Sequence, residues 1–290
     1  MKELVVISGK GGTGKTSITA SLAVLADNPV IADCDVDAAD LHLVLAPQII
    51  EQHEFKSGHE AIIDSDKCTG CGVCFANCRF DAVSEYKKPD GTACFIIDPV
   101  ACEGCGVCVR FCPAGAIDFP ERLCGKWMIS DTRCGPMVHA KLGVAAENSG
   151  KLVSTVRQKA KSIAEEQGRN IVIVDGPPGI GCPVIASLTG TTMALIVTEP
   201  TISGEHDMKR VLSLAKHFGV PSAVCVNKWD LNPEMTASIE EKAKEAGAEI
   251  AGRIRYDRAV TQAQILEKSV VETDAPSAKD IRNMWSHLNL

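Results

Sequence analysis

The sequence predicts an α/β fold built on a doubly wound, mostly parallel sheet, with a small second domain inserted into it. Three observations lead to this prediction. The chain begins with an apolar strand, a glycine-rich loop, a helix and a second strand, which together make a βαβ unit. Apolar runs later alternate with charged helical stretches, which is typical of a sheet covered on both faces. Between about residues 62 and 120 the composition changes, and cysteine and glycine dominate.

Short runs rich in β-branched and other apolar residues mark the strands of the larger domain. We expect these strands at residues 3–8, 29–35, 170–179, 193–200, 222–230 and 248–257. We expect amphipathic helices to begin near Lys15 and to cover 205–219 and 233–247. The C-terminal stretch repeats apolar residues with helical spacing, at Ile281, Met284, Trp285 and Leu288. Because Arg282 is the one arginine or lysine within 280–290, we expect this helix to pack against its own domain and not against a membrane.

Composition and charge argue against several classes of function. The formal net charge of −7 and the 4% aromatic content disfavour nucleic-acid binding, which needs clustered cations and stacking side chains. No apolar run approaches the roughly 18 residues that span a bilayer, and the N-terminus lacks a signal-peptide pattern. We therefore expect a cytoplasmic protein without stable membrane insertion. Fourteen cysteines in such a protein indicate metal binding or redox chemistry, because disulfides are disfavoured in the cytoplasm.

Residues 9–16, GKGGTGKT, match the nucleotide-binding pattern G-x-x-x-x-G-K-[ST] between the first strand and the first helix. Glycines in such a loop let backbone N–H groups surround phosphate oxygens, and the helix N-terminus adds positive potential. Lys15 would reach the β- and γ-phosphates, and Thr16 would hold Mg²⁺. The predicted nucleotide-binding residues of the loop are Gly11, Gly12, Thr13, Gly14, Lys15, Thr16 and Ser17.

The cysteine-rich segment contains the spacing C-x₂-C-x₂-C-x₃-C twice, the second copy 34 residues after the first. This spacing is typical of bacterial ferredoxins with two [4Fe–4S] clusters, in which the fourth cysteine of each copy binds the other cluster. One predicted ligand set is Cys68, Cys71, Cys74 and Cys112, and the other is Cys102, Cys105, Cys108 and Cys78. Paired zinc sites are the alternative, but zinc sites rarely use four cysteines at this spacing. We therefore expect a small α+β ferredoxin domain at 61–121, inserted between residues 1–60 and 122–290 of a P-loop NTPase.

The loop KGGTGKT resembles the deviant Walker A loop of the MinD/ParA/nitrogenase-iron-protein superfamily of ATPases. The resemblance extends to residues 32–40, which look like switch I, and to 171–181, which look like the Walker B strand and switch II. It implies that Lys10 contacts the partner's phosphates across a dimer, and that Lys10 and Lys15 neutralise charge on the γ-phosphate. It implies also that Asp35 orients the attacking water and that Asp175 holds Mg²⁺ together with Thr16. Three nearby carboxylates stay unranked as Mg²⁺ neighbours: Asp33, Asp37 and Asp40.

The segment CVNKWD, residues 225–230, leaves two interpretations of the base. N-K-x-D after an apolar strand resembles the guanine-binding motif of GTPases, in which the aspartate binds the base. In MinD-like proteins an asparagine at this strand end binds adenine, and the other motifs of the chain are of the MinD type. We therefore expect ATP, with Asn227 on the base and Asp230 as a helix cap or turn residue.

Six cysteines lie outside the two repeats: Cys34, Cys94, Cys124, Cys134, Cys182 and Cys225. Cys34 and Cys225 lie within or beside apolar strands, where free cysteine packs as a small hydrophobic residue. Cys94 and Cys124 flank the repeats and have no predicted role. Cys182 lies in the presumed switch II, where the nitrogenase iron protein has a cysteine that binds a cluster bridging its dimer. The resemblance therefore raises a bridging metal at Cys182, with Cys134 as a weaker partner ligand; the alternative is a thiol in a switch loop.

The whole chain resembles MinD-superfamily ATPases that carry an inserted two-cluster ferredoxin domain. This resemblance implies an ATPase that couples its nucleotide state to electron transfer through two [4Fe–4S] clusters. The alternative is an ATP-dependent carrier or scaffold for the assembly of iron–sulfur or mixed-metal cofactors. Positioning of the MinD kind is disfavoured, because it leaves the eight cysteines of the repeats unexplained. The expected partners are a second copy or a related ATPase in a dimer, and a redox or cofactor-assembly protein.

Overall fold

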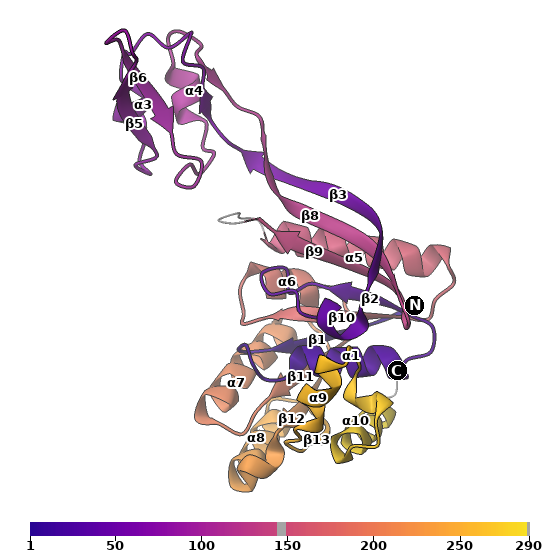
Figure 1. The fold of residues 1–290 in the computed structure, drawn as a ribbon. Helices are drawn as coiled ribbons and strands as arrows, with labels where there is room; N and C mark the ends of the chain where they lie inside the picture. The colour runs from indigo at the N-terminus through magenta and orange to yellow at the C-terminus, as the bar shows by residue number, and fades with distance from the viewer. Residues whose placement is uncertain (144–148, 289–290) are drawn as a thin grey trace. The chain divides into compact units, whose positions relative to one another are not determined.

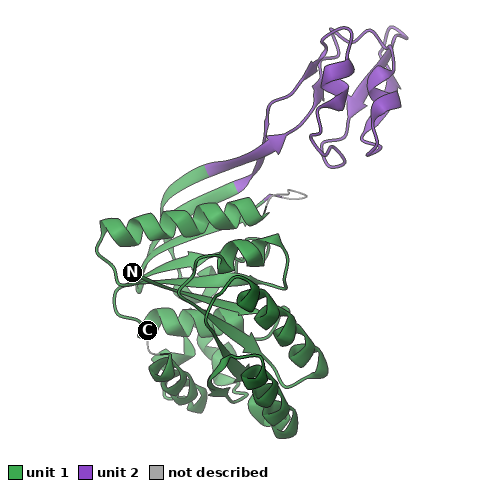
Figure 2. Cartoon of the chain, turned by 180° about the vertical axis from the view of Figure 1, so that it is seen from behind, with its two compact units in different colours: residues 1–53, 126–142, 148–290 green, residues 54–125, 143–147 purple. Residues whose placement is uncertain are grey.

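The computed structural model describes residues 1–143 and 149–288, which divide into two compact units (Figure 2). Unit 1 holds the described residues within 1–53, 126–142 and 149–288, and unit 2 holds 54–125 and Gly143. The boundaries predicted for the inserted domain, at residues 61 and 121, lie a few residues inside the limits of unit 2.

Unit 1 is centred on a nine-stranded sheet with the order β13-β12-β11-β1-β10-β2-β9-β8-β3 (Figure 1). In this order the strands are Glu249–Ile254, Ser222–Asn227, Met193–Thr198, Lys2–Ser8, Ile171–Pro178, Pro29–Asp33, Gly135–Leu142, Glu121–Thr132 and Gln48–His59. Every neighbouring pair from β13 to β9 is parallel. The predicted mostly parallel α/β fold is confirmed.

Helices cover both faces of this sheet (Figure 1). They are α1 (Lys15–Leu25), α2 (His42–Leu45), α5 (Ser149–Glu166), α6 (Cys182–Leu188), α7 (Ile202–His217), α8 (Pro233–Glu245), α9 (Ala259–Ile265) and α10 (Pro276–His287), with 3₁₀ turns η1 (Trp229–Leu231) and η2 (Val270–Glu272). Successive residues of a strand point to opposite faces. Leu4 and Val6 accordingly pack in one core with residues of α1 and α10, whereas Glu3 binds a side chain of α5.

Burial explains why these strands are so apolar. Residues Leu4 to Ile7 of β1 are fully buried, as expected for a parallel strand covered on both faces. The C-terminal helix α10 buries Ile281 and Met284 in the core of unit 1, and Leu288, directly after the helix, is buried there too. This helix packs on its own domain, as predicted. Within residues 1–143 and 149–288, no helix is both long enough and apolar enough to cross a membrane.

Strands β9, β8 and β3 were not predicted, and they extend the sheet beyond β2. The edge strand β3 shows why: of its twelve residues, only Phe55 and Ser57 are buried. A strand that is exposed along most of its length needs neither an apolar run nor regular alternation. It therefore lacks the pattern from which the other strands were predicted.

Unit 2 contains two short antiparallel pairs, β4 (Ile62–Ile63) with β7 (Ile117–Asp118) and β5 (Val83–Lys87) with β6 (Ala93–Ile97), and the helices α3 (Val73–Asn77) and α4 (Val107–Phe111). The first repeat supplies β4, α3 and β5, and the second supplies β6, α4 and β7. Each strand pair therefore joins one strand from each repeat. The two halves share one apolar core and are interleaved, so neither is a module by itself.

Candidate functional site

The nucleotide-binding loop, residues 9–14, connects β1 to α1. Gly14 has a positive φ of 87°, and a Cβ there would lie 2.3 Å from Nδ2 of Asn227, so only glycine fits. Gly11 and Gly12, by contrast, have open space beside them. Apart from the residues next to each glycine in the sequence, no heavy atom of the described residues lies within 4 Å of a Cβ placed at either position. The loop therefore contacts Asn227 on one side and leaves its other side open to a ligand.

Lys15, Thr16 and Asp175 meet at the carboxyl end of the sheet, although the lysine and the aspartate are 160 residues apart. Nζ of Lys15 donates to Oδ1 of Asp175 at 2.8 Å, and the hydroxyl of Thr16 donates to Oδ2 at 2.8 Å. Both Lys15 and Asp175 are buried. Burial alone would lower the pKa of Lys15, but the charges of Asp175 and Asp35 outweigh it and raise that pKa. Lys15 is therefore a permanently charged group on the floor of the loop.

Asp33 and Thr13 carry unsatisfied polar atoms at this site. Oδ2 of Asp33 and Oγ1 of Thr13 are buried and have no hydrogen-bond partner among the residues that the structure describes. Burial, and then the charge of Asp175, raises the pKa of Asp33 well above its usual range. Buried polar atoms of this kind call for a partner. A hard cation that binds oxygen ligands suits the oxygens of Asp33, Thr16 and Asp175, so the residues present fit Mg²⁺.

Asp35 lies beside Lys15 at this site, whereas Asp37 and Asp40, the remaining carboxylates of residues 32–40, do not. Oδ2 of Asp35 is 3.3 Å from Nζ of Lys15, and the side chain is nearly buried. Burial raises the pKa of Asp35, although Lys15 acts to lower it. Asp37 and Asp40 are exposed. Of the three carboxylates that the sequence left unranked, Asp33 is thus the one at the nucleotide loop.

Lys10, in the same loop, is bound to its own chain. Its Nζ lies 2.6 Å from Oε1 of Glu199 and 3.0 Å from the hydroxyl of Ser203. Glu199 follows β11 at the same end of the sheet as the loop. Sequence reasoning missed this glutamate; the available signal was its position directly after a buried parallel strand, where functional groups of α/β proteins gather.

A cavity that is open to solvent begins at the loop and is lined by Gly14, Ser17, Asn227, Tyr256 and Gln264, among others. Asn227 is fixed at its edge, because its Nδ2 donates to the carbonyl of Thr13 at 2.7 Å. Asp230 is not part of the lining, and its Oδ1 accepts the backbone N–H of Tyr256 at 2.7 Å. The carboxylate that the guanine interpretation requires is thus engaged in holding a turn.

Two cavities in unit 2 are each lined by four cysteines. The first is lined by Cys68, Cys71, Cys74 and Cys112 together with apolar side chains. The second is lined by Cys78, Cys102, Cys105 and Cys108, among others. Each set takes three cysteines from one repeat and one from the other.

The chemistry of these two cavities suits an iron–sulfur cluster. All of their cysteines are free thiols, and thiolates are the ligands of [4Fe–4S] clusters. In the first cavity the backbone N–H of Ala116 also points at the sulfur of Cys112, at 3.4 Å. Within the described residues, no group of three or more His, Cys, Asp or Glu is arranged to hold a single metal ion. The [4Fe–4S] clusters themselves remain a prediction.

The structure does not bring Cys134 to Cys182. Cys182 is exposed and begins α6, just after β10 ends at Pro178. Cys134 lies in the turn between β8 and β9, where the neighbouring Gly135 abuts the carbonyl of Pro29 at the start of β2. Since β2 and β10 run parallel, the two cysteines lie at opposite ends of the sheet, so one chain does not bring Cys134 and Cys182 to the same metal. A metal at Cys182 that bridges a dimer stays a prediction. Cys34 and Cys225 are fully buried, as predicted.

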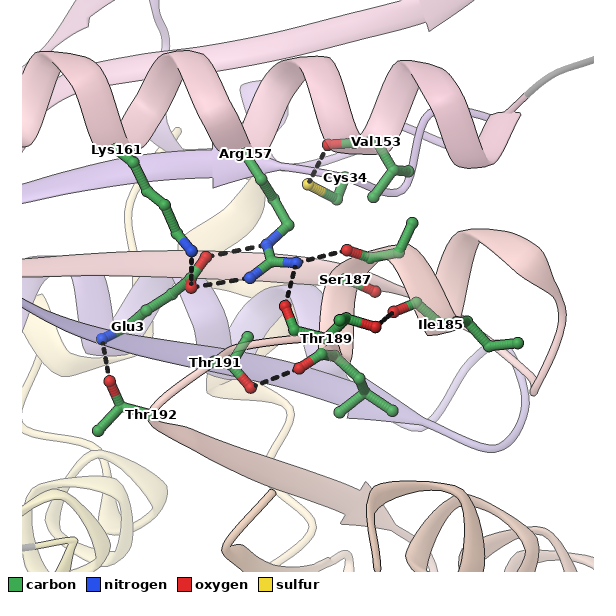
Figure 3. A network of polar contacts seen from close by, with 12 residues as sticks. Glu3, Cys34, Val153, Arg157, Lys161, Ile185, Ser187, Thr189, Thr191 and Thr192 are labelled. Carbon is green, nitrogen blue, oxygen red and sulfur yellow. Dashed lines mark hydrogen bonds and ion pairs between the residues drawn. The ribbon is translucent and has the colours of Figure 1, made fainter. Parts of the chain in front are cut away.

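A buried ion pair that the sequence did not indicate lies between α5, β1 and the end of α6 (Figure 3). Arg157 of α5 donates to both carboxylate oxygens of Glu3 on β1, at 2.9 and 2.8 Å. Lys161 lies 2.7 Å from the same carboxylate. Arg157 also donates to the carbonyls of Ala186 and Thr189, which end α6. The pair therefore fixes the C-terminal end of the helix that Cys182 begins.

Comparisons with known proteins agree with this geometry. The family described as the CobQ/CobB/MinD/ParA nucleotide binding domain matches residues 4–270. The uncharacterized protein MJ0578 of Methanocaldococcus jannaschii is 35% identical over 235 residues, 79% of this chain and 79% of that protein. A second protein of that organism, MJ0579, is 26% identical over 264 residues, 80% of this chain and 83% of its own length.

Solved structures of MinD share the fold. The septum site-determining protein MinD of Pyrococcus horikoshii OT3, complexed with Mg-ADP, superposes with a TM-score of 0.58 at 16% identity, over 99% of this chain and 96% of that one. The cell division ATPase MinD of Pyrococcus furiosus superposes with a TM-score of 0.56 at 17% identity, over 99% and 98%. The family match covers most of the sequence and includes the loop, Asp175 and Asn227. The chain therefore belongs to the CobQ/CobB/MinD/ParA nucleotide-binding family.

Proposed function

We propose that this protein binds and hydrolyses ATP, and that its nucleotide state controls electron transfer through two [4Fe–4S] clusters held by unit 2. One observation carries the proposal. The same chain combines an open nucleotide loop with two cavities that are each lined by four free cysteines, shared crosswise between the repeats. Binding and hydrolysis of a nucleotide do not require these eight thiols, so the cysteine cavities point to a second chemistry in the same chain.

The reaction at the loop is the attack of water on the γ-phosphate of ATP, which gives ADP and phosphate. Catalysis of phosphoryl transfer rests mainly on positioning and on neutralising charge. The backbone N–H groups of the loop would surround the phosphates, with Lys15 supplying a positive charge below them. Mg²⁺ bound by Thr16, Asp33 and Asp175 would add positive charge to the same phosphates. Asp35, held 3.3 Å from Lys15, would accept a hydrogen bond from the attacking water and orient it.

ATP is the proposed nucleotide in preference to GTP. Adenine would enter the cavity bordered by Asn227 and Tyr256. The recognition of guanine through the N-K-x-D motif needs a free carboxylate. One carboxylate oxygen of Asp230 accepts the backbone N–H of Tyr256, and Asp230 lies outside the cavity lining.

The two cysteine sets would each hold one cluster, and the clusters would supply one-electron redox chemistry. The contribution of the chain is to fix the thiolates and to surround them with apolar side chains such as Phe95 and Ile117 in the first cavity. Apolar walls and N–H donors such as that of Ala116 adjust the reduction potential. We propose further that the protein works as a dimer with itself or with a related ATPase, and that it serves a redox partner.

The proposal is tested on protein purified without oxygen. We expect about eight iron atoms per chain, the number that two [4Fe–4S] clusters contain, and an EPR signal of reduced clusters. Cys71→Ser should lose about half of the iron, while Cys134→Ser, a matched change outside both cavities, should lose none. ATP should change the rate at which reduced protein passes electrons to an acceptor. Cluster potentials and electron-transfer rates that are indifferent to ATP would refute the coupling.

A second function, delivery of an iron–sulfur or mixed-metal cofactor, is favoured by one observation. Cys182 is exposed at the start of α6, where a thiol is accessible to a metal carried between proteins. If the protein is a carrier, Cys182→Ala should slow the transfer of iron to an acceptor that lacks its cofactor, and should leave the iron of unit 2 in place. Unchanged transfer would remove the main support for this second function.

A further inference from the structure

Glu199 links the nucleotide loop to two lysines. Its Oε1 lies 2.6 Å from Nζ of Lys10, and its Oε2 lies 3.2 Å from Nζ of Lys228. Lys228 also donates to the carbonyl of Gly12, at 3.3 Å. One carboxylate therefore holds a lysine from within the loop and a lysine that follows β12, and it does so beside the open face of the loop.

The position of Glu199 is fixed by the chain around it. The carbonyl of Glu199 accepts the N–H of Thr201 at 2.7 Å, and Thr201 caps the first turn of α7. A Cβ at Gly204 would lie 2.3 Å from the same carbonyl, so the turn is closely packed. Burial acts to raise the pKa of Glu199, but the hydrogen bonds from Lys10 and Lys228 outweigh it and lower the pKa. The group is therefore an anion at neutral pH.

The Glu199 carboxylate carries a negative charge beside the nucleotide loop, as a bound phosphate group would. Lysines bind carboxylate and phosphate oxygens with the same charge-assisted hydrogen bonds. When a nucleoside triphosphate enters the loop, its charges come close to Glu199, and like charges repel. Lys10 and Lys228 can then exchange the carboxylate for phosphate oxygens.

We propose that Glu199 is an internal competitor of the triphosphate, which keeps Lys10 and Lys228 on their own chain until ATP displaces it. The inference deepens the proposed function, on which it rests, by naming a residue that sets the affinity for nucleotide. Glu199 acts through Lys10 and Lys228 and is a positioning residue. Its removal should free both lysines for the phosphates and strengthen the binding of ATP.

Glu205 offers a matched control on the same helix-start segment. It too binds two lysines, Lys209 at 2.9 Å and Lys242 at 2.7 Å. These lysines come from α7 and α8, and none of the contacts described for Glu205 involves a loop residue. The variant Glu205→Gln therefore changes the net charge and breaks two ion pairs as Glu199→Gln does, but away from the phosphates.

The test is the Kd for ATP and for ADP, measured by titration calorimetry on the full chain. We expect Glu199→Gln to bind ATP about fivefold more tightly than the wild type, the scale of a partly exposed ion pair. The gain for ADP should be smaller, because ADP brings less charge to the loop. Glu205→Gln should bind both nucleotides as the wild type does. In a Lys10→Ala background, Glu199→Gln should lose most of its gain.

Four outcomes separate the alternatives. Unchanged or weaker ATP binding by Glu199→Gln would overturn the inference, and so would an equal gain in Glu205→Gln, which would show a general charge effect. A gain that persists in full without Lys10 would overturn it as well. If the wild type itself binds no ATP, the proposed function fails, and the inference fails with it for that distinguishable reason.

Discussion

Replacement of Arg157 by methionine would leave Glu3 as a buried carboxylate whose one remaining ion pair among the described residues is with Lys161. Glu3 is 3% exposed and Arg157 is 6% exposed, so solvent cannot take the place of the lost guanidinium. Removing one partner of a buried ion pair costs about 3–5 kcal/mol. Because Lys161 stays 2.7 Å from the carboxylate, we expect the lower end, about 3 kcal/mol. For a chain of this size that lowers Tm by roughly 6–12 °C.

The assay is thermal and urea unfolding of the wild type, Arg157→Met, Glu3→Met and the double variant. Replacing both charges by apolar side chains of similar volume removes the stranded charge, so the double variant should be more stable than Arg157→Met by at least about 1 kcal/mol. As a control, Lys161→Met should cost less than about 1 kcal/mol, since Lys161 is partly exposed. A double variant whose loss equals the sum of the two single losses would refute the reasoning.

Three further predictions concern other parts of the chain. Burial, and then nearby His42, lowers the pKa of His139 from 6.5 to about 4. The free energy of unfolding should therefore fall as the pH drops from 6.5 to about 4, by up to about 1.4 kcal/mol per pH unit. His139→Gln should flatten this part of a curve of Tm against pH. Asp230→Ala should keep the preference for ATP over GTP in binding titrations. Asn227→Ala should weaken ATP binding about tenfold, through the loss of a partly buried amide and of its hydrogen bond to the carbonyl of Thr13. Cys112→Ser should reduce the iron content as Cys71→Ser does, although the two residues lie in different repeats, and iron analysis that shows otherwise would contradict the crosswise ligand sets.

The nucleotide end of the sheet was predictable because its signals are local and its assembly follows a general rule. An apolar strand, a glycine loop and a lysine identify the first part of the site, and a second apolar strand ends at Asp175. Parallel strands that are neighbours bring their carboxyl ends together, which is how Lys15 meets an aspartate from β10 at 2.8 Å. The spacing of the cysteines likewise indicated which four would share a cavity.

Other features could not be predicted from the sequence, because they depend on residues that are distant in the chain. Arg157 lies on an amphipathic helix, where a charged residue is expected to face solvent, and only the position of Glu3 shows that this one is buried. Strand β3 is mostly exposed and has no apolar run. Cys134 was linked to Cys182 through a family resemblance that its own surroundings do not share, and the strand directions place it at the opposite end of the sheet.

The place of β1 in the sheet has a consequence for the order in which a new molecule matures. Leu4 of β1 pairs with Ile173 on one side and Met193 on the other. β1 is the first strand to leave the ribosome, but it cannot pair with β10 and β11 until most of the chain has been translated. Residues 54–125 are complete far earlier, and domains fold as units during synthesis. The cysteine cavities can therefore form before the nucleotide loop has a sheet to support it.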